Sequence, residues 1–217
     1  MSSSAFVHIV DDDASVCESL GELLRSINYQ VTLHGSAAEF LKAELPDLPS
    51  CLVLDVRLPH TSGLELQEYL TRVNIRLPII LMTGYGDILM SVKAMKAGAV
   101  DFLTKPIRNQ DLLDAVAVAI RIDQTRRQEA AQITELRQRY DLLTPREQQV
   151  VSLVASGLMN KQIAGELAIS EVTVKMHRSS AMRKLQAKSA AMLIRMVGTL
   201  DTASDAPIRA QGPFHKN

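Results

Sequence analysis

The sequence has little of what aromatic recognition or covalent cross-linking needs. Tryptophan is absent, aromatic residues make up 4 %, and only two cysteines, Cys17 and Cys51, occur among 217 residues. Proteins that bind single-stranded nucleic acid stack its bases on aromatic side chains, so the low aromatic content argues against that class. Two cysteines cannot build a disulfide-rich secreted framework. This usage is typical of a reducing cytoplasm, where we expect the protein to act.

Long apolar runs and targeting signals are also missing. No apolar run reaches the roughly 18 residues that a membrane helix needs, and Met1–Phe6 lacks the basic and apolar regions of a signal peptide. We therefore expect no membrane partner. The length favours two domains, and 47 % apolar with 22 % charged residues is ordinary for globular proteins.

The formal net charge of zero conceals two halves of opposite sign. Residues 1–121 hold 15 acidic and 10 basic residues, a net charge of −5, whereas residues 122–217 hold 9 acidic and 14 basic residues, a net charge of +5. Cationic side chains release counterions from phosphates, so the basic half is a candidate for binding nucleic acid. A chance distribution of charge explains the asymmetry equally well if it is taken alone.

The first half alternates between short apolar runs and amphipathic stretches. Nearly continuous runs of Val, Ile and Leu predict strands that are buried on both faces of a parallel sheet. The expected strands are residues 6–10, 30–34, 51–54, 78–82 and 101–104. Helical spacing or capping residues follow each run. We therefore expect an α/β domain with a doubly wound, five-stranded parallel sheet.

Charged and polar residues stand where these strands end. They are Asp11, Asp12 and Asp13 after strand one, Asp55 at strand three, Thr83 at strand four and Lys105 at strand five. The carboxyl ends of parallel strands share one edge of the sheet, which brings these side chains together. Clustered carboxylates need a cation, and their hard oxygen atoms suit Mg²⁺. With a hydroxyl and an amine to hold phosphoryl oxygens, the set predicts phosphoryl transfer to a carboxylate nucleophile.

Three further residues near this edge are expected to have structural roles. Asp13 is better placed to cap the first helix than to bind metal. His8 alternates with buried strand positions, and His60 lies in a loop with no orienting partner in the sequence.

Residues 1–121 resemble a two-component receiver domain. The resemblance rests on Val-His-Ile-Val-Asp-Asp-Asp (7–13), Leu-Val-Leu-Asp-Val-Arg-Leu-Pro (52–59), Ser-Gly-Leu-Glu-Leu (62–66), Met-Thr-Gly-Tyr-Gly-Asp (82–87) and Ala-Gly-Ala-Val-Asp-Phe-Leu-Thr-Lys-Pro (97–106). The family implies a strand order of 2-1-3-4-5. It also implies that a sensor histidine kinase phosphorylates Asp55.

The same resemblance assigns the other residues of the edge. Asp11 and Asp12, with Asp55 and the backbone carbonyl of Arg57, would hold Mg²⁺. The phosphoryl-binding and switch residues would be Thr83, Phe102 and Lys105. The Lys105–Pro106 peptide bond would be cis.

The second half is predicted to be helical. Residues 110–139 lack Gly and Pro and are rich in helix-forming residues, but their apolar stripe lapses over residues 123–132. Either one helix continues through this stretch or it breaks near Thr125. Downstream, Thr144-Pro145-Arg146-Glu147 predicts a helix start, and residues 168–170 predict a tight turn before a third helix that Ser170 caps. This is helix-turn-helix spacing, although an ordinary small bundle remains open.

Residues 143–197 resemble a LuxR/FixJ-type DNA-binding domain. The resemblance rests on Leu-Thr-Pro-Arg-Glu (143–147), Gly-Leu-Met-Asn-Lys-Gln-Ile-Ala (157–164), Thr-Val-Lys-Met-His-Arg (173–178) and Lys-Leu (184–185). The family places residues 171–185 in the major groove of double-stranded DNA. Base edges would be nearest Lys175, Met176 and Ser179, and phosphates would be met by Asn160, Lys161, Thr173, His177 and Arg178.

These features predict the domain organisation and leave two functions to compare. We expect a receiver at 1–121, a helical linker at 122–141, a DNA-binding domain at 142–200 and a disordered tail at 201–217. The favoured function is a phosphorylation-switched transcription factor, not an enzyme, that forms a homodimer through residues 88–121, with RNA polymerase as a candidate partner. The alternative is an Mg²⁺-dependent phosphohydrolase. It would need a base for water attack, and Arg57 stands two residues after Asp55, where a second acid would be expected.

Overall fold

The computed structural model describes residues 5–84 and 88–204. The chain forms two compact units, one extending to Arg127 and the other beginning at Gln128. Helix α5 (Asn109–Asp141) is continuous and supplies residues to both units, so it does not break near Thr125. Among the described residues, no helix combines the length and the apolarity that a membrane crossing requires.

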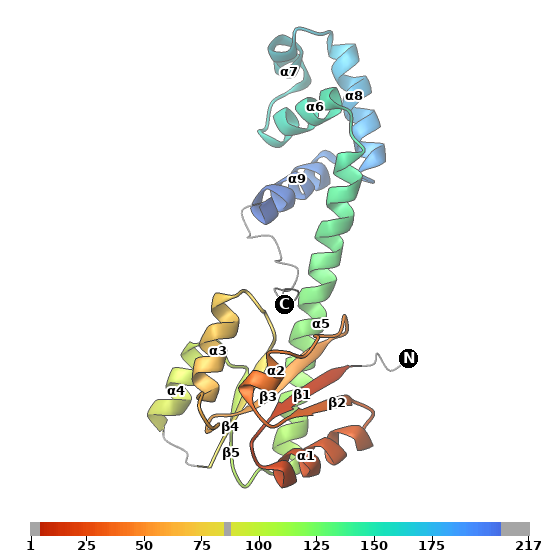
Figure 1. Ribbon diagram of the computed structural model, residues 1–217. Helices are drawn as coiled ribbons and strands as arrows, with labels where there is room; N and C mark the ends of the chain where they lie inside the picture. Colours follow the sequence, from red (N-terminus) through yellow and green to blue (C-terminus); the bar gives the residue numbers. More distant parts are fainter. Residues whose placement is uncertain (1–4, 85–87, 205–217) are drawn as a thin grey trace. The chain divides into compact units, whose positions relative to one another are not determined.

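The first unit is built on a five-stranded sheet in which every pairing is parallel (Figure 1). Its strands are β1 (Phe6–Val10), β2 (Gln30–His34), β3 (Ser50–Asp55), β4 (Ile79–Thr83) and β5 (Asp101–Thr104). Their spatial order is β2-β1-β3-β4-β5. The predicted fold class and strand order are confirmed, and predicted and observed strand ends agree within one residue.

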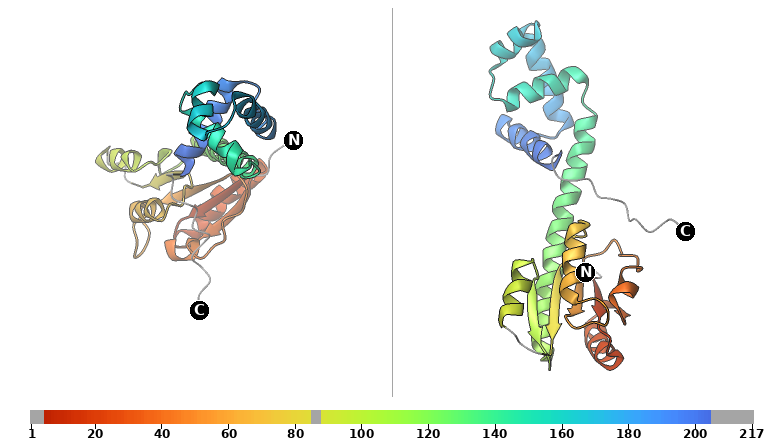
Figure 2. Two further views of the ribbon diagram at one scale, coloured as in Figure 1. Left: turned by 90° about the horizontal axis from the view of Figure 1, so that it is seen from above. Right: turned by 60° about the vertical axis from the view of Figure 1, so that its left-hand side comes forward.

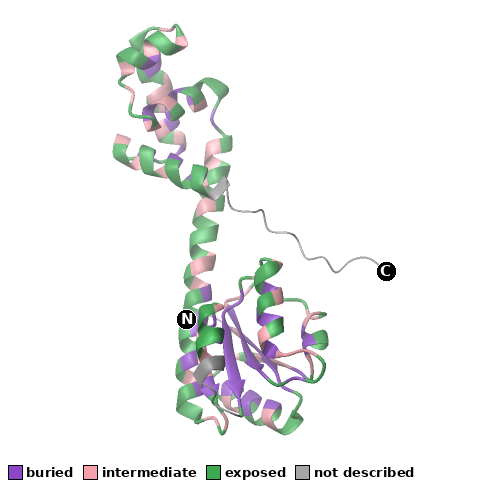
Figure 3. Ribbon diagram, turned by 90° about the vertical axis from the view of Figure 1, so that its left-hand side faces the viewer, coloured by how far each residue is buried: buried purple, intermediate pink, exposed green. Residues whose placement is uncertain are grey.

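Helices cover both faces of this sheet, as Figure 2 shows from two further directions. Helix α1 (Ala14–Ser26) and the first part of α5 pack on one face. Helices α2 (Ala37–Phe40), α3 (Gly63–Arg72) and α4 (Ile88–Lys96) pack on the other. Because both faces are covered, the central strands are buried along their length (Figure 3).

The second unit is a small helical core. It contains α6 (Pro145–Ala155), α7 (Asn160–Leu167), α8 (Glu171–Lys184) and α9 (Ala190–Ser204). Thr144 caps α6, and the Glu147 side chain accepts the Thr144 N–H in return, which completes the predicted capping box. Between α7 and α8, Ala168 adopts a left-handed conformation and Ser170 caps α8. The short turn gives the predicted helix-turn-helix.

The residues predicted to form a linker divide between the two units. Asp123 is fully buried and accepts hydrogen bonds from Ser50 N–H and the Arg127 guanidinium. Leu136 and Tyr140, farther along the same helix, pack against the core of the second unit. The apolar stripe lapses over residues 123–132 because its first part is held by ion pairs of Asp123 with Arg126 and Arg127, and residues 128–132 are exposed to solvent.

Residues 201–204, which were predicted to belong to a disordered tail, are helical. Helix α9 continues to Ser204, and Leu200, near its end, is buried with its carbonyl accepting a hydrogen bond from Arg137. Residues 205–217 lie outside the described residues.

Candidate functional site

The carboxylates of the first unit meet at the carboxyl edge of the sheet. Asp11 follows β1 and Asp55 ends β3, and these strands are paired with Val10 opposite Leu54. Asp11 and Asp55 are buried, whereas Asp12 is exposed. One carboxylate oxygen from each of the three lies within 4.8 Å of the others. The sheet therefore assembles the acidic cluster that its strand ends predicted.

Lys105 neutralises the two buried carboxylates. Its Nζ lies 2.6 Å from Asp11 Oδ2 and 2.7 Å from Asp55 Oδ2. Burial opposes the charged ammonium, but hydrogen bonds to Asp11 and Asp55 outweigh this, so the pKa of Lys105 is raised. Burial also raises the pKa of Asp11, and hydrogen bonds from Lys105 and the Asp13 N–H offset this only in part.

Backbone groups hold Asp55 and Lys105 in place. The Arg57 N–H donates to Asp55 Oδ1 at 3.1 Å, and the Lys105 N–H donates to the Thr83 carbonyl at 2.7 Å. The Lys105–Pro106 peptide bond is cis, as the resemblance implied. Gly63 packs so closely on Asp55 that an added Cβ would lie 2.3 Å from the Asp55 carbonyl oxygen. Position 63 therefore excludes larger side chains.

Thr83 and Phe102 lie on the two strands beyond Asp55. Thr83 is the last residue of β4 and is fully buried. Phe102, on β5, is half-buried and packs against the core beneath α3 and α4. The structure thus places both residues on strands next to the acidic edge. Part of the 82–87 motif, residues 85–87, lies outside the described residues.

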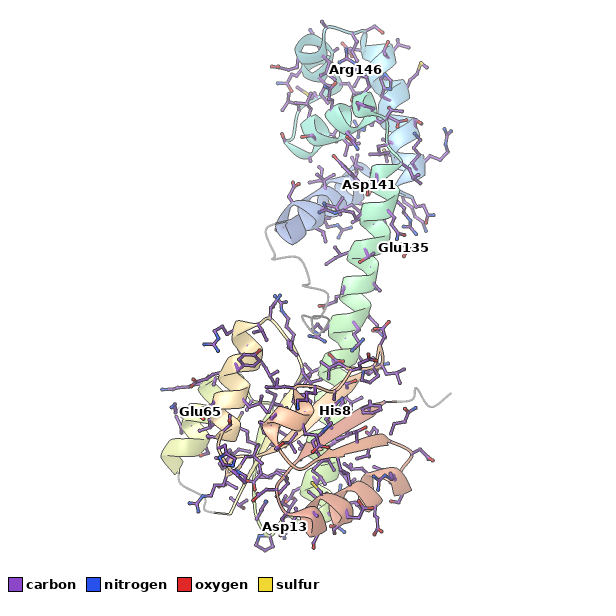
Figure 4. The ribbon with its side chains drawn as sticks, viewed as in Figure 1. His8, Asp13, Glu65, Glu135, Asp141 and Arg146 are labelled. Atoms are coloured by element: carbon purple, nitrogen blue, oxygen red, sulfur yellow. The ribbon has the colours of Figure 1, made fainter. Side chains whose placement is uncertain are left out.

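Asp13, His8 and His60 occupy the positions expected of structural residues. Asp13 Oδ1 accepts hydrogen bonds from Ser15 N–H and Val16 N–H and so caps α1. His8 is buried in β1, and His60 is exposed in the loop after β3. Figure 4 labels Asp13 at the start of α1 and His8 within the sheet.

The donor atoms of the acidic cluster fit Mg²⁺. All three side chains offer carboxylate oxygens, and the exposed Asp12 leaves one side open to water, as an ion that keeps several waters requires. The backbone of Arg57 is adjacent, since its N–H contacts Asp55.

The second unit presents a basic surface on α7 and α8. Val174, Ala181 and Leu185 are buried and fix which side of α8 faces the core. Lys161, Lys175, Met176 and Ser179 are exposed, whereas Asn160, Thr173, His177 and Arg178 are half-buried. Arg178 Nη1 donates to Asn160 Oδ1 at 3.1 Å, which joins α8 to the start of α7.

A groove runs along one flank of α8. Its volume is about 670 Å³, and four cationic side chains line it without any acidic partner in its lining: Lys175, Arg178, Arg183 and Lys188. Arg183 and Lys188 are not among the residues predicted to contact DNA. Helical periodicity could not predict that Lys188 lines the groove, because Lys188 follows α8. Its place beside Arg178 depends on the turn of the chain at Gln186, which has a positive φ of 57°.

Comparisons with known proteins match both units to established families. Residues 7–117 match the response regulator receiver domain, and residues 141–197 match the bacterial regulatory proteins of the LuxR family. The chain is a two-component response regulator. Its predicted family and transcription-regulating function are thereby confirmed.

Relatives of this response regulator align over nearly its full length. It is 52 % identical to nodulation protein W of Bradyrhizobium diazoefficiens, over 94 % of this chain and 90 % of that protein. It is 44 % identical to the transcriptional regulatory protein FixJ of Azorhizobium caulinodans, over 90 % of this chain and 93 % of that protein.

Solved structures of response regulators also resemble it. The structure of StyR has 49 % sequence identity and a TM-score of 0.78, covering 90 % of this chain and 98 % of that chain. Full-length FixJ from B. japonicum has 37 % identity and a TM-score of 0.56, covering 93 % of this chain and 99 % of that chain.

Proposed function

We propose that a sensor histidine kinase phosphorylates Asp55 of this response regulator and that the phosphoryl group controls promoter binding by the second unit. The geometry around Asp55 carries the proposal. Its carboxylate is buried and accepts a hydrogen bond from Lys105, and it lies at the same edge of the sheet as Asp11 and Asp12. A nucleophile, a fixed ammonium and an oxygen-donor cluster are the groups that phosphoryl transfer to a carboxylate needs.

The transfer step places the phosphoryl group among these donors. A carboxylate oxygen of Asp55 attacks the phosphorus of a phosphohistidine, the P–N bond breaks, and the imidazole nitrogen keeps the electron pair. Lys105 and the Thr83 hydroxyl bind phosphoryl oxygens, and the Arg57 N–H keeps the carboxylate oriented. Mg²⁺, held by Asp11, Asp12, Asp55 and the Arg57 carbonyl, would neutralise charge on the transferred group.

The switch acts through Thr83 and Phe102. When Thr83 turns toward a phosphoryl oxygen, it vacates space that the half-buried Phe102 ring can fill. This rearrangement alters the surface of α4, β5 and α5, where Val92, Met95 and Val118 are exposed. Two copies then pair through this surface, so each contact occurs twice. Charged groups of the same stretch add about 0–1 kcal/mol per exposed pair; they are Lys93, Lys96, Asp101, Arg108, Asp111 and Asp114.

The output is recognition of double-stranded DNA. Helix α8 enters the major groove, with Lys175, Met176 and Ser179 toward base edges. Phosphates are contacted from both sides of that helix by Asn160, Lys161, Thr173, His177 and Arg178. A dimer places two such helices on half-sites about one helical turn apart. RNA polymerase at the promoter is a further proposed partner.

The proposed organisation is a receiver at 1–121, a connecting helix at 122–141 and a DNA-binding domain from 142. Since the partners are a kinase and chromosomal DNA, we expect the protein to act in the cytoplasm. A regulator is favoured over a phosphohydrolase, because the position two residues after Asp55 holds Arg57, which cannot activate water as a base.

Phosphorylation by a small acyl phosphate with Mg²⁺ tests the assignment of Asp55. Mass spectrometry of the intact chain should show one added phosphoryl group on the wild type and on Asp141→Asn, a matched change at an exposed residue of α5 (Figure 4). The variant Asp55→Asn should keep its helical circular dichroism and gain no phosphoryl group, because an amide is not a carboxylate nucleophile. Labelling of Asp55→Asn at the wild-type rate would show that another residue is the acceptor.

A further inference from the structure

Two large apolar side chains are exposed to solvent on the outer side of helix α8. Val172 and Met176 are each 67 % exposed; among the large apolar side chains of the described residues, only Leu142 and Met159 exceed this, at 69 % each. They are four residues apart, so they lie next to each other on one helix face, with about 5–6 Å between their Cβ atoms. Together they form a small apolar patch, which a partner with matching apolar groups would cover.

Their place on the helix is opposite to the core. Successive residues of an α-helix are about 100° apart around its axis, and Val174, Ala181 and Leu185 mark the buried side. Val172 and Met176 therefore form the outermost line of the helix. Lys175 is exposed beside this line, and Arg183 is exposed two turns farther along it. The groove that both help to line carries no acidic side chain.

The charge around the pair selects its partner. An apolar pair with Lys175 beside it and a cationic groove on the same flank of the helix suits a polyanion that carries apolar groups in a recess between its phosphates. The major groove of DNA has this arrangement, because the C5-methyl group of thymine is the apolar feature of its base edges. A neutral apolar partner would leave the cations of the groove without counter-charges.

We propose that Val172 and Met176 read the methyl groups of thymines in the operator half-site. This inference rests on the proposed DNA binding and adds a specificity-determining residue, Val172, that the motif resemblance did not point to. Neighbouring bases on one strand are about 3.4 Å apart along the axis. Side chains about 5–6 Å apart therefore reach methyl groups one or two base pairs apart.

The two residues contribute differently to selectivity. Val172 is β-branched and has one strongly preferred rotamer in a helix, so it holds its methyl groups at a fixed place. Met176 has three flexible torsions and adapts to its surroundings. The position read by Val172 should consequently be the more strictly thymine of the two.

The experiment removes the methyl groups without changing base pairing. Duplexes are first selected from random sequence with the full chain in beryllofluoride and Mg²⁺, and each thymine of the selected half-site is then replaced by deoxyuridine. Loss of one contacted methyl should weaken wild-type binding about 4-fold, the equivalent of burying one carbon group. At least two thymines, one or two base pairs apart, should show this effect.

Matched variants assign each methyl to its side chain. Val172→Ser removes both methyl groups of the residue, and Met176→Gln removes the apolar end of the side chain while keeping its approximate length. Each variant should lose the deoxyuridine effect at one position and retain it at the other. Ile194→Thr, at an exposed apolar residue of α9, should keep both effects. Circular dichroism checks that all three remain folded.

The outcomes separate this inference from the proposed function. Selective, salt-dependent binding that is unchanged by deoxyuridine at every position would overturn the methyl reading and leave DNA binding intact. The same conclusion follows if both variants retain the full effect of deoxyuridine. Absence of any sequence-selective binding would overturn the proposed function and, with it, this inference.

Discussion

Asp123 on α5 accepts a hydrogen bond at 2.9 Å from the backbone N–H of Ser50, the first residue of β3. The same strand ends at Asp55. The strand that carries the proposed phosphoacceptor is therefore tied at its other end to the helix that continues into the second unit. Asp123 also pairs with Arg126 and Arg127, and Arg127 reaches Asp47, so a charge network holds α5 against the receiver.

Removing this carboxylate should destabilise the receiver. Asp123 is fully buried, so Asp123→Ala removes the acceptor of the Ser50 N–H and the carboxylate that Arg126 and Arg127 share. We expect a loss of about 3 kcal/mol in the free energy of unfolding. Glu135→Ala is the matched control on the same helix, since the Glu135 side chain is 60 % exposed in its pair with Arg139 (Figure 4). It should cost less than about 0.5 kcal/mol. Denaturant unfolding followed by circular dichroism measures both, and equal losses would contradict the buried network.

The acidic edge was predictable and the Asp123 network was not, for a physical reason. Strand periodicity and the geometry of parallel sheets fix where Asp11 and Asp55 must meet, so local sequence is enough. The partner of Asp123 is 73 residues away, and a buried ion pair produces the same polar pattern as a solvated helix. The groove side chain Lys188 likewise depends on a turn at Gln186 that no periodicity marks.

The buried pair of His8 and His34 should make the receiver sensitive to acid. His8 Nδ1 lies 3.2 Å from His34 Nε2, and burial, with the charge of His34, lowers the pKa of His8 to about 4. The unfolded chain binds a proton near pH 6.5 and the folded chain does not. Stability is therefore full above pH 6.5 and declines as the pH falls toward 4.

His8→Val should remove the part of this acid loss that His8 contributes, while His34, whose pKa burial also lowers, keeps its own part. Between pH 7 and pH 5, we expect the wild type to lose about 2 kcal/mol more unfolding free energy than the variant. His60→Asn is the control, because His60 is an exposed loop residue with a positive φ that Asn tolerates. It should lose stability as the wild type does. Denaturant titrations at the two pH values decide the matter, and an identical pH response of His8→Val and wild type would rule out this role.

Glu147 should stabilise the second unit until the solution becomes strongly acidic. Burial opposes its charge, but hydrogen bonds from Lys184, Ser180 and the Thr144 N–H lower its pKa to about 2. Its Oε2 lies 2.7 Å from Lys184 Nζ. Because the folded pKa is depressed, this contribution is present above pH 4.5 and declines as the pH falls toward 2.

Glu147→Gln should therefore loosen α6 at pH 7 by about 3 kcal/mol. Hydrogen exchange of the α6 amides in the full chain reports this free energy, and the difference from wild type should shrink at pH 3. Glu166→Gln changes an exposed acid of α7 and should leave α6 protection unaltered. A difference that stays constant between pH 7 and pH 3 would show that the carboxylate charge is not responsible.

Lys175 and Lys161 should affect DNA binding in different ways. Lys175 is exposed on α8 and is assigned to base edges, so Lys175→Ala should weaken binding to a selected site by about 1–3 kcal/mol and binding to random DNA far less. Lys161, exposed on α7, is assigned to phosphate. Lys161→Ala should weaken both and lower the salt slope by about one. Titrations at several salt concentrations measure these quantities. Equal effects of the two changes on the selected site and on random DNA would contradict the assignment of Lys175 to base edges and Lys161 to phosphates.

The central claim is that a phosphoryl group on Asp55 increases both dimerisation and DNA affinity. Sedimentation and DNA titration of the same samples, with and without beryllofluoride and Mg²⁺, test it most directly. The wild type should become dimeric at micromolar concentration and bind its selected duplex at least about tenfold more tightly, a change of about 1.4 kcal/mol, while Asp55→Asn responds in neither measurement. Tighter DNA binding by a chain that stays monomeric, or the same response from Asp55→Asn, would contradict the claim.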